Sequence, residues 1–349
     1  MSLKASILRN KNLVVATFGK HGVRTPFSYE RYNSCFRKFG MVLDNENEKP
    51  DILCSGFHID IPAESERIFA IKKRNPAVKI FIISEEPLWD LTWHNDPFSF
   101  KQKCKVTGLE YFYINHYNCN AFEISKLPYF ITTDTKYTAR YLMLLSRFKN
   151  LTPTDLISHW HNCRYLISCF VENRQDEKYS VNKNGFIAHS NLRTHLAASV
   201  YHNKIAQVQG KGWGTDTPRQ SLPDWHADKL TRTYKCSKYL MAIENTDAPS
   251  YITEKVFDAF CSLAIPVIVT SQLGELEKLI CSPAAIEVDS RDIDEFGNKL
   301  KVFTTNQSFA ERYLKNIRQL HSIFRNVENI EKAVFKYTES FANEIKKAI

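Results

Sequence analysis

The chain has 349 residues, a hydrophobic fraction of 43% and a formal net charge of +9. This length predicts two domains, and the apolar fraction excludes wholesale disorder. The sequence lacks a run of about 18 apolar residues, as a membrane span requires, and the apolar segment of a signal peptide, so we expect a soluble, cytoplasmic protein. The positive charge favours an anionic partner, such as a nucleotide-sugar, an acidic glycolipid, a membrane surface or nucleic acid.

Neither disulfides nor metal ions are expected in this chain. The nine cysteines, an odd number, are scattered without a C-x-x-C pair, which predicts reduced thiols and argues against a zinc knuckle. His159 and His161 have the spacing of two ligands on one face of a strand, but no third ligand lies near them in the sequence. We therefore predict no metal site.

The first half of the chain alternates short apolar runs with amphipathic segments, which is typical of an α/β domain. Residues 12–18, 51–55 and 78–83 are expected strands, and residues 27–39 and 64–74 are expected helices. The first strand leads into a glycine turn that lacks the G-x-G-x-x-G spacing, so a dinucleotide site is only weakly indicated.

Proline and turn-forming residues at 151–155 predict a linker between two domains. We accordingly expect a first domain over residues 1–155, a second over residues 156–330 and an amphipathic helix over residues 331–349. An apolar stripe runs along this helix, formed by Val334, Tyr337, Phe341, Ile345 and Ile349. The helix is expected either to pack onto the first domain or to dock on an anionic membrane surface, although its glutamates weaken the second interpretation.

The most informative stretch is residues 238–269, which has the pattern of a βαβ unit. Residues 238–244 are an apolar strand, and turn formers up to Pro249 then take the chain out of the sheet. Thr253 is the expected N-cap of a helix with one apolar face, and residues 265–269 form the next buried strand. The sequence therefore predicts a parallel sheet with a ligand site beyond the ends of its strands.

Four polar residues, Asn245, Tyr251, Glu254 and Lys255, occupy the loop and the first turn of this helix. A carboxylate accepts hydrogen bonds from a ribose diol, and an ammonium at a helix N-terminus neutralises phosphate. The alternative is that Glu254 only complements the helix dipole and Lys255 is solvated.

The order of these residues resembles the signature of the α-1,3-fucosyltransferase family, glycosyltransferase family 10, in a bacterial-type form. The matching segments are Ile243-Glu-Asn245, Tyr251-Ile-Thr-Glu-Lys255 and Ile265-Pro-Val. The resemblance implies a GT-B-type fold, with two Rossmann-like domains, the acceptor in the first, a GDP-sugar in the second and a cleft between them. It also implies that Asn245, Tyr251, Glu254 and Lys255 hold the guanosine diphosphate.

Arg193 is a further candidate for the donor site. It follows Ser190-Asn191 at the start of an expected helix, where the family has an arginine that clamps the pyrophosphate. A guanidinium in the first turn of a helix faces the positive end of the helix dipole, so an anionic ligand explains it better than helix stability does. The spacing between Asn191 and Arg193 is shorter than is usual in the family.

The segment Ser84-Glu-Glu-Pro87 follows an expected strand, at the point where the family carries its general base. The resemblance assigns this role to Glu85, with Glu86 as the alternative because the loop is shorter than the family's. Taken alone, the motif is equally typical of a capped loop. Trp89, Trp93 and His94 lie just beyond, where aromatic residues stack on a sugar of the acceptor or belong to the core.

The predicted function is inverting transfer of fucose from GDP-fucose to a hydroxyl of a glycan or glycolipid, such as a lipopolysaccharide oligosaccharide. The resemblance implies no cofactor and no obligatory metal, and a second donor, for example GDP-heptose, stays open. Two other functional classes fit the sequence less well. A nucleic-acid-binding module needs a concentrated basic stripe, whereas these charges are dispersed, so we predict no nucleic-acid partner. A glycoside hydrolase using Glu85 with Glu254 has no need of Arg193 and Lys255.

Overall fold

The structure is a computed structural model that describes residues 12–93, 96–125, 127–183, 186–202, 205–214 and 221–349. The chain forms two compact units, each of which is described by itself. Unit 1 draws on Met1–Glu86, Trp93–Phe122 and Val334–Ile349, and unit 2 on Pro87–Thr92 and Glu123–Ala333. These units differ from the predicted domains, because residues 123–155 fall in unit 2 rather than with the first domain.

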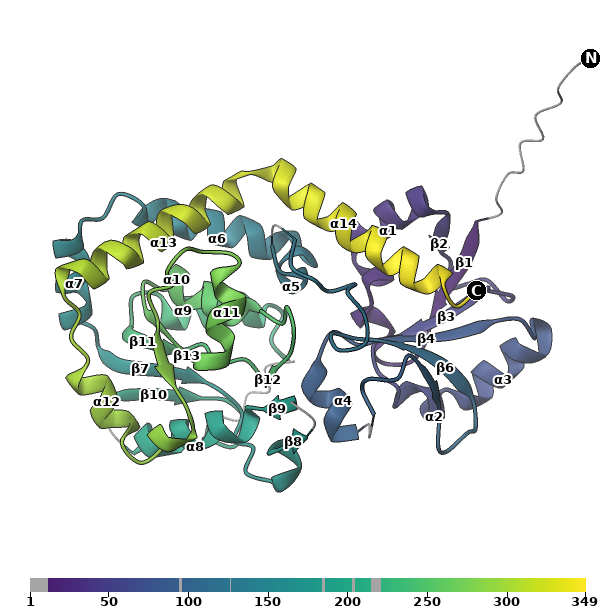
Figure 1. Ribbon diagram of the computed structural model, residues 1–349, viewed down its shortest axis with the longest axis horizontal. Coiled ribbons are helices and arrows are strands. Elements are labelled where there is room, and N and C mark those ends of the chain that lie inside the picture. Colours follow the sequence, from purple (N-terminus) through teal and green to yellow (C-terminus); the bar gives the residue numbers. More distant parts are fainter. Residues whose placement is uncertain (1–11, 94–95, 126, 184–185, 203–204, 215–220) are drawn as a thin grey trace, which may run out of the picture. The chain divides into compact units, whose positions relative to one another are not determined.

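Unit 1 is built on a six-stranded sheet with the order β2-β1-β3-β4-β6-β5 (Figure 1). All neighbouring strands are parallel except β5, which is antiparallel to β6. The strands are β1 (Leu13–Thr17), β2 (Met41–Leu43), β3 (Ile52–Ser55), β4 (Lys79–Ile83), β5 (Lys101–Lys103) and β6 (Glu110–Ile114). Every residue of β3 and the last four of β4 are buried, as expected for strands covered on both faces.

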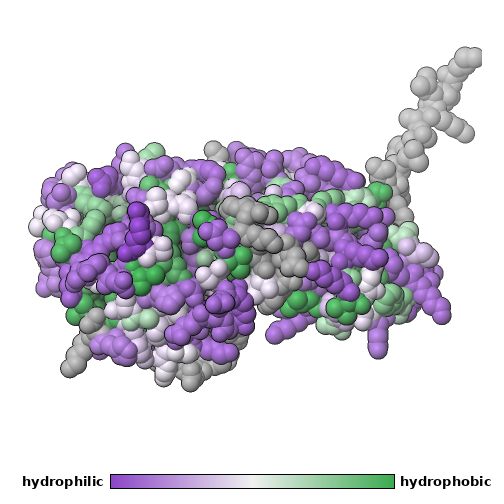
Figure 2. All heavy atoms as spheres, turned by 60° about the horizontal axis from the view of Figure 1, so that its bottom comes forward, coloured by the Kyte–Doolittle hydropathy of each residue, from purple (hydrophilic) through white to green (hydrophobic). Residues whose placement is uncertain are grey.

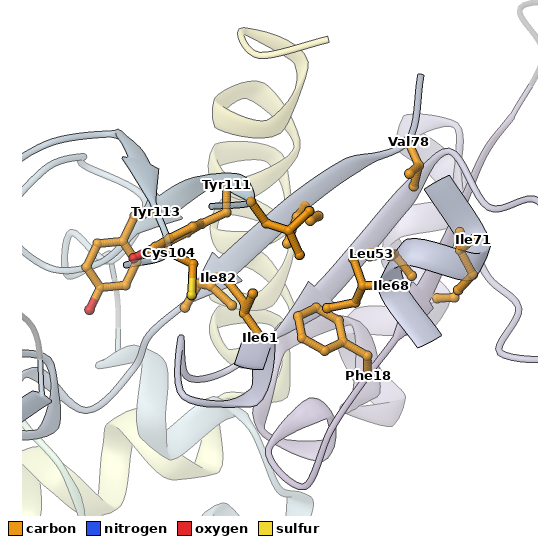
Figure 3. Close-up of a cluster of buried hydrophobic side chains, with 13 residues drawn as sticks. Phe18, Leu53, Ile61, Ile68, Ile71, Val78, Ile82, Cys104, Tyr111 and Tyr113 are labelled. Atoms are coloured by element: carbon orange, nitrogen blue, oxygen red, sulfur yellow. The ribbon is translucent and has the colours of Figure 1, made fainter. Parts of the chain in front are cut away.

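One face of this sheet packs against α2 (Asp60–Ala63) and α3 (Ser65–Arg74), as Figure 3 shows. Ile80 and Ile82 of β4 point into this core because alternate residues of a strand share a face. The core of this face consists of Ala16, Phe18, Leu53, Ile61, Ile68, Ile71, Val78, Ile80, Ile82, Cys104, Leu109, Tyr111 and Tyr113. Unit 1 also contains α1 (Glu30–Phe36), which is flanked by the short 3-10 helices η2 (Pro26–Ser28) and η3 (Arg37–Phe39).

The C-terminal helix α14 (Val327–Lys346) contributes its last turns to unit 1. Phe335 packs beside Phe39 with ring centroids 5.2 Å apart, and Phe341 meets the edge of Phe122 at 5.0 Å. Four of the five residues of the predicted apolar stripe are buried, whereas Ile349 is 54% exposed. Packing onto the first unit, one of the two expectations for this helix, is therefore confirmed.

Unit 2 contains a five-stranded parallel sheet with the order β10-β7-β11-β13-β14. Its strands are β7 (Tyr165–Phe170), β10 (Ala206–Gln209), β11 (Ser237–Met241), β13 (Ile265–Val269) and β14 (Ile286–Val288). A small antiparallel sheet, β12-β9-β8, joins β8 (Asn182–Lys183), β9 (Phe186–Ala188) and β12 (Thr246–Asp247). The predicted α/β class and the βαβ unit from residue 238 to residue 269 are confirmed.

Helices cover the parallel sheet of unit 2. The helix α6 packs against both α10 and α13, and α7 also contacts α13. The helices assigned to this unit are α4 (Pro87–Trp93), α5 (Tyr129–Thr132), α6 (Thr135–Phe148), α7 (Pro153–His161), α8 (Ser190–Tyr201), α9 (Trp225–Thr233), α10 (Glu254–Cys261), α11 (Thr270–Glu277), α12 (Phe296–Val302) and α13 (Gln307–Arg325).

The segment predicted as a linker begins helix α7 instead. Pro153 occupies its first turn, and Thr152 and Asp155 form a capping box in which the Thr152 hydroxyl accepts from the Asp155 amide. His159 and His161 therefore lie on a helix, where residues two apart point in different directions, so their placement on a strand was wrong.

The two parallel sheets share one topological feature. In unit 1 the chain runs from β1 to β2 on one side and then crosses to β3 on the other, and in unit 2 it runs from β7 to β10 and then crosses to β11. In open α/β sheets, ligands bind beyond the carboxyl ends of the strands at such a reversal of strand order. The loops after β1, β3, β7 and β11 are therefore the places to examine for function.

Figure 2 shows hydrophilic residues spread widely over the face that it displays, with smaller hydrophobic patches among them. None of the helices in the described part of the chain is long and apolar enough to span a membrane.

Candidate active site

The loop from β11 to α10 contains the predicted nucleotide-binding residues, and a buried carboxylate organises it. Glu244 is 1% exposed and accepts hydrogen bonds from the Thr253 amide at 2.7 Å and from the Lys255 ammonium at 2.8 Å. The Thr253 hydroxyl also donates to Glu244, at 2.8 Å, so it does not cap the helix with its side chain as the sequence predicts. Glu244 thus fixes the start of α10 and the position of the Lys255 charge.

Glu254, the first residue of α10, lies between two ammonium groups. Its Oε1 is 3.8 Å from Lys255 Nζ and 3.9 Å from Lys229 Nζ, and its side chain is almost fully buried. One turn later Asp258 is fully buried and pairs with Lys229 at 2.7 Å and with His226 at 2.8 Å. Burial alone would raise the pKa of Asp258, but Lys229 and His226 outweigh it and lower that pKa.

This cluster also receives a contact from α6. The Tyr141 hydroxyl donates to Asp258 at 2.9 Å, and burial together with the Asp258 charge raises the pKa of Tyr141 well above its ordinary value. Tyr141, Lys229 and His226 therefore hold α10 from its buried side. This cluster could not be recognised in the sequence, because its members come from three helices.

Arg193 lies in the first turns of α8 and reaches the loop after β11. Its Nη1 donates to the Asn245 side-chain oxygen, while its buried Nε has no hydrogen-bond partner among the described residues. Burial and the neighbouring Arg174 lower the pKa of Arg193 to about 10. A guanidinium that is 8% exposed and incompletely hydrogen-bonded is well suited to an anionic ligand.

The small antiparallel sheet positions Asn245. The backbone amide of His189 donates to the Asn245 carbonyl at 2.7 Å, and the next residue, Thr246, pairs with Ala188 of β9. Tyr251, at the far end of the same loop, is buried. The structure therefore brings Arg193 into contact with Asn245 and places Glu254 beside Lys255. The binding of a donor by these residues stays a prediction.

Glu85 in unit 1 follows β4 and is 5% exposed. Its Oε1 accepts a hydrogen bond from the Tyr29 hydroxyl at 2.7 Å, while its buried Oε2 has no hydrogen-bond partner in the part of the chain that the structure describes. Burial raises the pKa of Glu85 above that of an ordinary carboxyl group, although Arg24 and the Tyr29 hydrogen bond oppose this effect. A buried carboxylate with an unused oxygen and a raised pKa has the properties of a general base.

Glu86 occupies a different environment from Glu85. Its Oε1 accepts a hydrogen bond from Arg24 Nη2 at 2.8 Å, whereas Glu85 lies 3.5 Å from Arg24 Nε. Burial lowers the pKa of Arg24, but Glu86 and Glu85 together raise it above its ordinary value. The two carboxylates thus share one guanidinium, and Glu86 forms the closer ion pair.

The aromatic residues predicted to bind an acceptor lie in or beside α4. The Trp89 ring is covered by the guanidinium of Arg174, 4.7 Å from its centroid, and is approached edge-on by Tyr179. Trp93 ends α4, and His94 lies outside the described residues. Contact of these residues with an acceptor stays a prediction.

A second titratable pair in unit 1 was not found by sequence reasoning. His21, in the loop after β1, is held by Asp60, whose carboxylate accepts from the His21 amide and contacts the ring Nδ1, both at 2.8 Å. Gly19 has φ +70°, and a Cβ there would collide with the Asp60 side chain. Gly19 therefore leaves room for the Asp60 side chain, which explains this glycine without a dinucleotide site.

Comparison with known families finds one match, in the second half of the chain. Residues 177–343 are similar to the model described as Glycosyltransferase family 10 (fucosyltransferase) C-term. No curated protein matches the chain significantly.

Solved structures of alpha1,3-fucosyltransferase resemble the whole chain at a low level. The free enzyme is 13% identical and covers 97% of this chain and 93% of its own, with a TM-score of 0.43. The complex with GDP covers 95% and 92% at 13% identity and a TM-score of 0.43, and the complex with GDP-fucose covers 94% and 92% at 13% identity and 0.42.

The segment that matches the family 10 model includes Arg193, Asn245, Tyr251, Glu254 and Lys255, whereas Glu85 and Glu86 precede it. In the described parts of the chain, no three His, Cys, Asp or Glu side chains are grouped as a metal site would require. Arg193 and Lys255 supply cations and hydrogen-bond donors, which suit a phosphate-bearing ligand.

Proposed function

We propose that this glycosyltransferase transfers fucose from GDP-fucose to a hydroxyl group of a glycan, with inversion at the anomeric carbon. The observation that carries the proposal is the grouping of Lys255, Glu254, Asn245 and Arg193 around the start of α10, within the segment that matches the family 10 model. The family is described as fucosyltransferase, which supports fucose as the sugar.

In the donor site, the cations are proposed to bind the diphosphate. Lys255 is fixed by Glu244 and therefore offers a charge whose position is set before the ligand arrives. Arg193 adds an N–H group that lacks a protein partner. Glu254 is proposed to accept hydrogen bonds from the ribose hydroxyls, and Asn245 and Tyr251 to complete the guanosine site. As GDP departs, these groups stabilise its developing negative charge, so the proposed mechanism requires no metal.

In unit 1, Glu85 is proposed to act as the general base. Its unused Oε2 would accept the proton of the acceptor hydroxyl while the hydroxyl oxygen forms a bond to the anomeric carbon. The bond between that carbon and the diphosphate oxygen breaks in the same step, and its electron pair leaves with GDP. Glu86 is the poorer candidate because Arg24 already neutralises it.

The proposal also includes an acceptor and a location for the protein. We propose a glycan or glycolipid acceptor, such as a lipopolysaccharide oligosaccharide, and a peripheral contact with anionic lipid. The buried stripe of α14 is used for packing, so such a contact would rely on the polar side of that helix, where lysines alternate with glutamates. Sedimentation of the protein with anionic vesicles, compared with neutral ones, tests this contact.

Calorimetric titration of the protein with GDP, UDP and RNA, in buffer with EDTA, tests the donor site. We expect GDP to bind and the other two ligands to bind weakly or not at all. Preference for UDP, or tight binding of RNA, would contradict the proposal. Product analysis with GDP-fucose and other GDP-sugars, such as a GDP-heptose, then identifies the transferred sugar.

A further inference from the structure

Arg174 lies in the loop after β7, at the reversal of strand order in the sheet of unit 2. The loop after β11, on the other side of this reversal, carries Asn245. Ligands of open α/β sheets bind between two such loops. Arg174 is therefore placed, by topology alone, beside the proposed donor site, although it belongs to none of the motifs found in the sequence.

The Arg174 side chain is held in one orientation by aromatic rings. Its guanidinium lies 4.7 Å from the ring centroid of Trp89 and 5.5 Å from that of Tyr179, and the two rings meet edge to face. A planar guanidinium stacks well on such rings and keeps its N–H groups free to donate in its own plane. Arg174 is thus oriented in the absence of a ligand.

The polar contacts of Arg174 point toward the N-terminus of α8. Its Nη1 donates to the hydroxyl of Ser190, the first residue of that helix, at 3.4 Å, and its backbone amide donates to Thr194 at 2.9 Å. Its Nη2 donates to Glu172 at 2.8 Å. These hydrogen bonds engage two of the five N–H donors of a guanidinium, which leaves donors for a ligand.

The charges around Arg174 favour the binding of an anion. Arg174 and Arg193 lie close enough for their like charges to repel, and both are near the positive end of the twelve-residue helix α8. Arg193 is 8% exposed, and its buried Nε finds no hydrogen-bond partner within the described ranges of the chain. Glu172 neutralises Arg174 only partly, since it is itself about one-third exposed. Two neighbouring guanidiniums at a helix N-terminus are stabilised when a diphosphate lies between them.

We propose that Arg174 binds the β-phosphate of the nucleotide-sugar together with Arg193, and that Trp89 and Tyr179 position it for this contact. This inference rests on the proposed function, because it takes the ligand to be a nucleoside diphosphate. It also gives Trp89 a role in donor binding through Arg174, in place of the predicted stacking on an acceptor sugar.

The test compares Arg174→Met with Arg164→Met in the full chain, using calorimetry with guanosine, GMP and GDP. Arg164 is a matched control, because it also stacks on an aromatic ring, 5.0 Å from the Tyr165 centroid, but at the opposite end of β7. We expect Arg174→Met to weaken GDP binding by about 10- to 100-fold, while guanosine and GMP bind as in the parent. Arg164→Met should change none of the three.

The outcomes separate this inference from the function on which it rests. If the parent protein does not prefer GDP to UDP, the proposed function fails. If the parent binds GDP and Arg174→Met binds it equally well, the contact with the β-phosphate is wrong. Equal weakening of guanosine, GMP and GDP would also overturn it, because that pattern indicates a structural role for Arg174.

A second variant tests the positioning role of Trp89. Trp89→Leu should weaken GDP binding less than Arg174→Met does, and it should cause no further loss in a protein that already carries Arg174→Met. Independent, additive effects of the two substitutions would show that Trp89 does not act through Arg174.

Discussion

The two parallel sheets have the same strand order around the reversal but opposite chemistry beyond it. In unit 2, the loops and helix starts carry Arg174, Arg193 and Lys255. In unit 1, Asp60 follows β3 at the reversal, and the Glu85–Glu86 pair follows the next strand of the sheet, β4. The two units thus present cations in one case and carboxylates in the other, so the side chains rather than the fold determine which ligand suits each unit.

The two units also differ in how their buried carboxylates are paired with cations. In unit 2, each buried carboxylate around α10 has a cation close by, as Glu244 has Lys255 and Asp258 has Lys229. In unit 1, Glu85 keeps one buried oxygen without a hydrogen bond, and its nearest cation is shared with Glu86. Paired charges preserve a binding site in one geometry, whereas an incompletely paired carboxylate is more basic and retains the capacity to take a proton.

The largest effect is expected from Glu85→Gln. This substitution keeps the shape of the side chain but removes its basic oxygen, so transfer should fall by about 10²- to 10⁴-fold while GDP affinity is unchanged. Single-turnover rates and calorimetry measure the two quantities. Glu86→Gln is the control and should lower the transfer rate far less. Equal losses of rate in both variants would indicate that the loop acts as a unit. A loss of rate confined to Glu86→Gln would show that Glu86 is the base.

Lys255→Ala should weaken GDP binding by about 1.5–3 kcal/mol, through loss of a charge-assisted contact with the diphosphate. Calorimetry checks this, and Lys278→Ala serves as the control because Lys278 forms an exposed ion pair with Glu275 at 2.7 Å. Melting curves of both variants are needed, because Lys255→Ala also leaves Glu244 buried without its cation. Unchanged GDP affinity in a folded Lys255→Ala protein would contradict the donor-site assignment.

Glu85→Gln is also expected to be as stable as the parent at pH 7, or more stable by up to about 2 kcal/mol. The pKa of Glu85 is raised in the folded protein, so the native state binds this proton more tightly than the unfolded state does. Ionisation therefore destabilises the fold, and this cost grows as pH rises from the unfolded toward the folded pKa. Denaturant unfolding of both proteins at pH 5 and pH 8 should show a larger difference at pH 8; the opposite trend would show that Arg24 and Tyr29 outweigh burial.

The smallest effect is expected from Tyr29→Phe. The Tyr29 hydrogen bond lowers the pKa of Glu85, so its loss should raise that pKa further and move the acid limb of the profile of kcat/KM against pH to higher pH. At pH 6 the rate should fall by about threefold to tenfold, with a smaller change at pH 8. A uniform loss at every pH would indicate that Tyr29 affects the reaction by another route.

The sequence predicted those parts of the structure that depend on neighbouring residues. The strand at β13 and the helix α10 follow from local apolar periodicity, and their bounds agree closely with expectation. Pro153 was misinterpreted as a breaker because the same residue is unfavourable inside a helix and favourable at its first position, and the capping box formed by Thr152 and Asp155 decides between the two.

The missed residues depend on contacts between distant segments. Arg174 lies in a polar stretch without a recognisable motif, and its ring partner Trp89 is far from it in the sequence. Glu244 belongs to the recognised Ile-Glu-Asn segment, but its role appears only when the chain folds back to bring Lys255 within 2.8 Å. Sequence patterns report which groups are present near a site, whereas burial and pairing determine which of them are available to a ligand.

The return of α14 to unit 1 has a consequence for how the protein is made. Tyr337, Phe341 and Ile345 are buried in a unit whose sheet is encoded in the first part of the chain. During translation these side chains leave the ribosome after all of unit 2, so the surface that receives them near Phe122 is exposed while the rest of the chain is being synthesised. Nascent unit 1 is therefore the part of this enzyme that most needs protection from aggregation, and its folding is completed last.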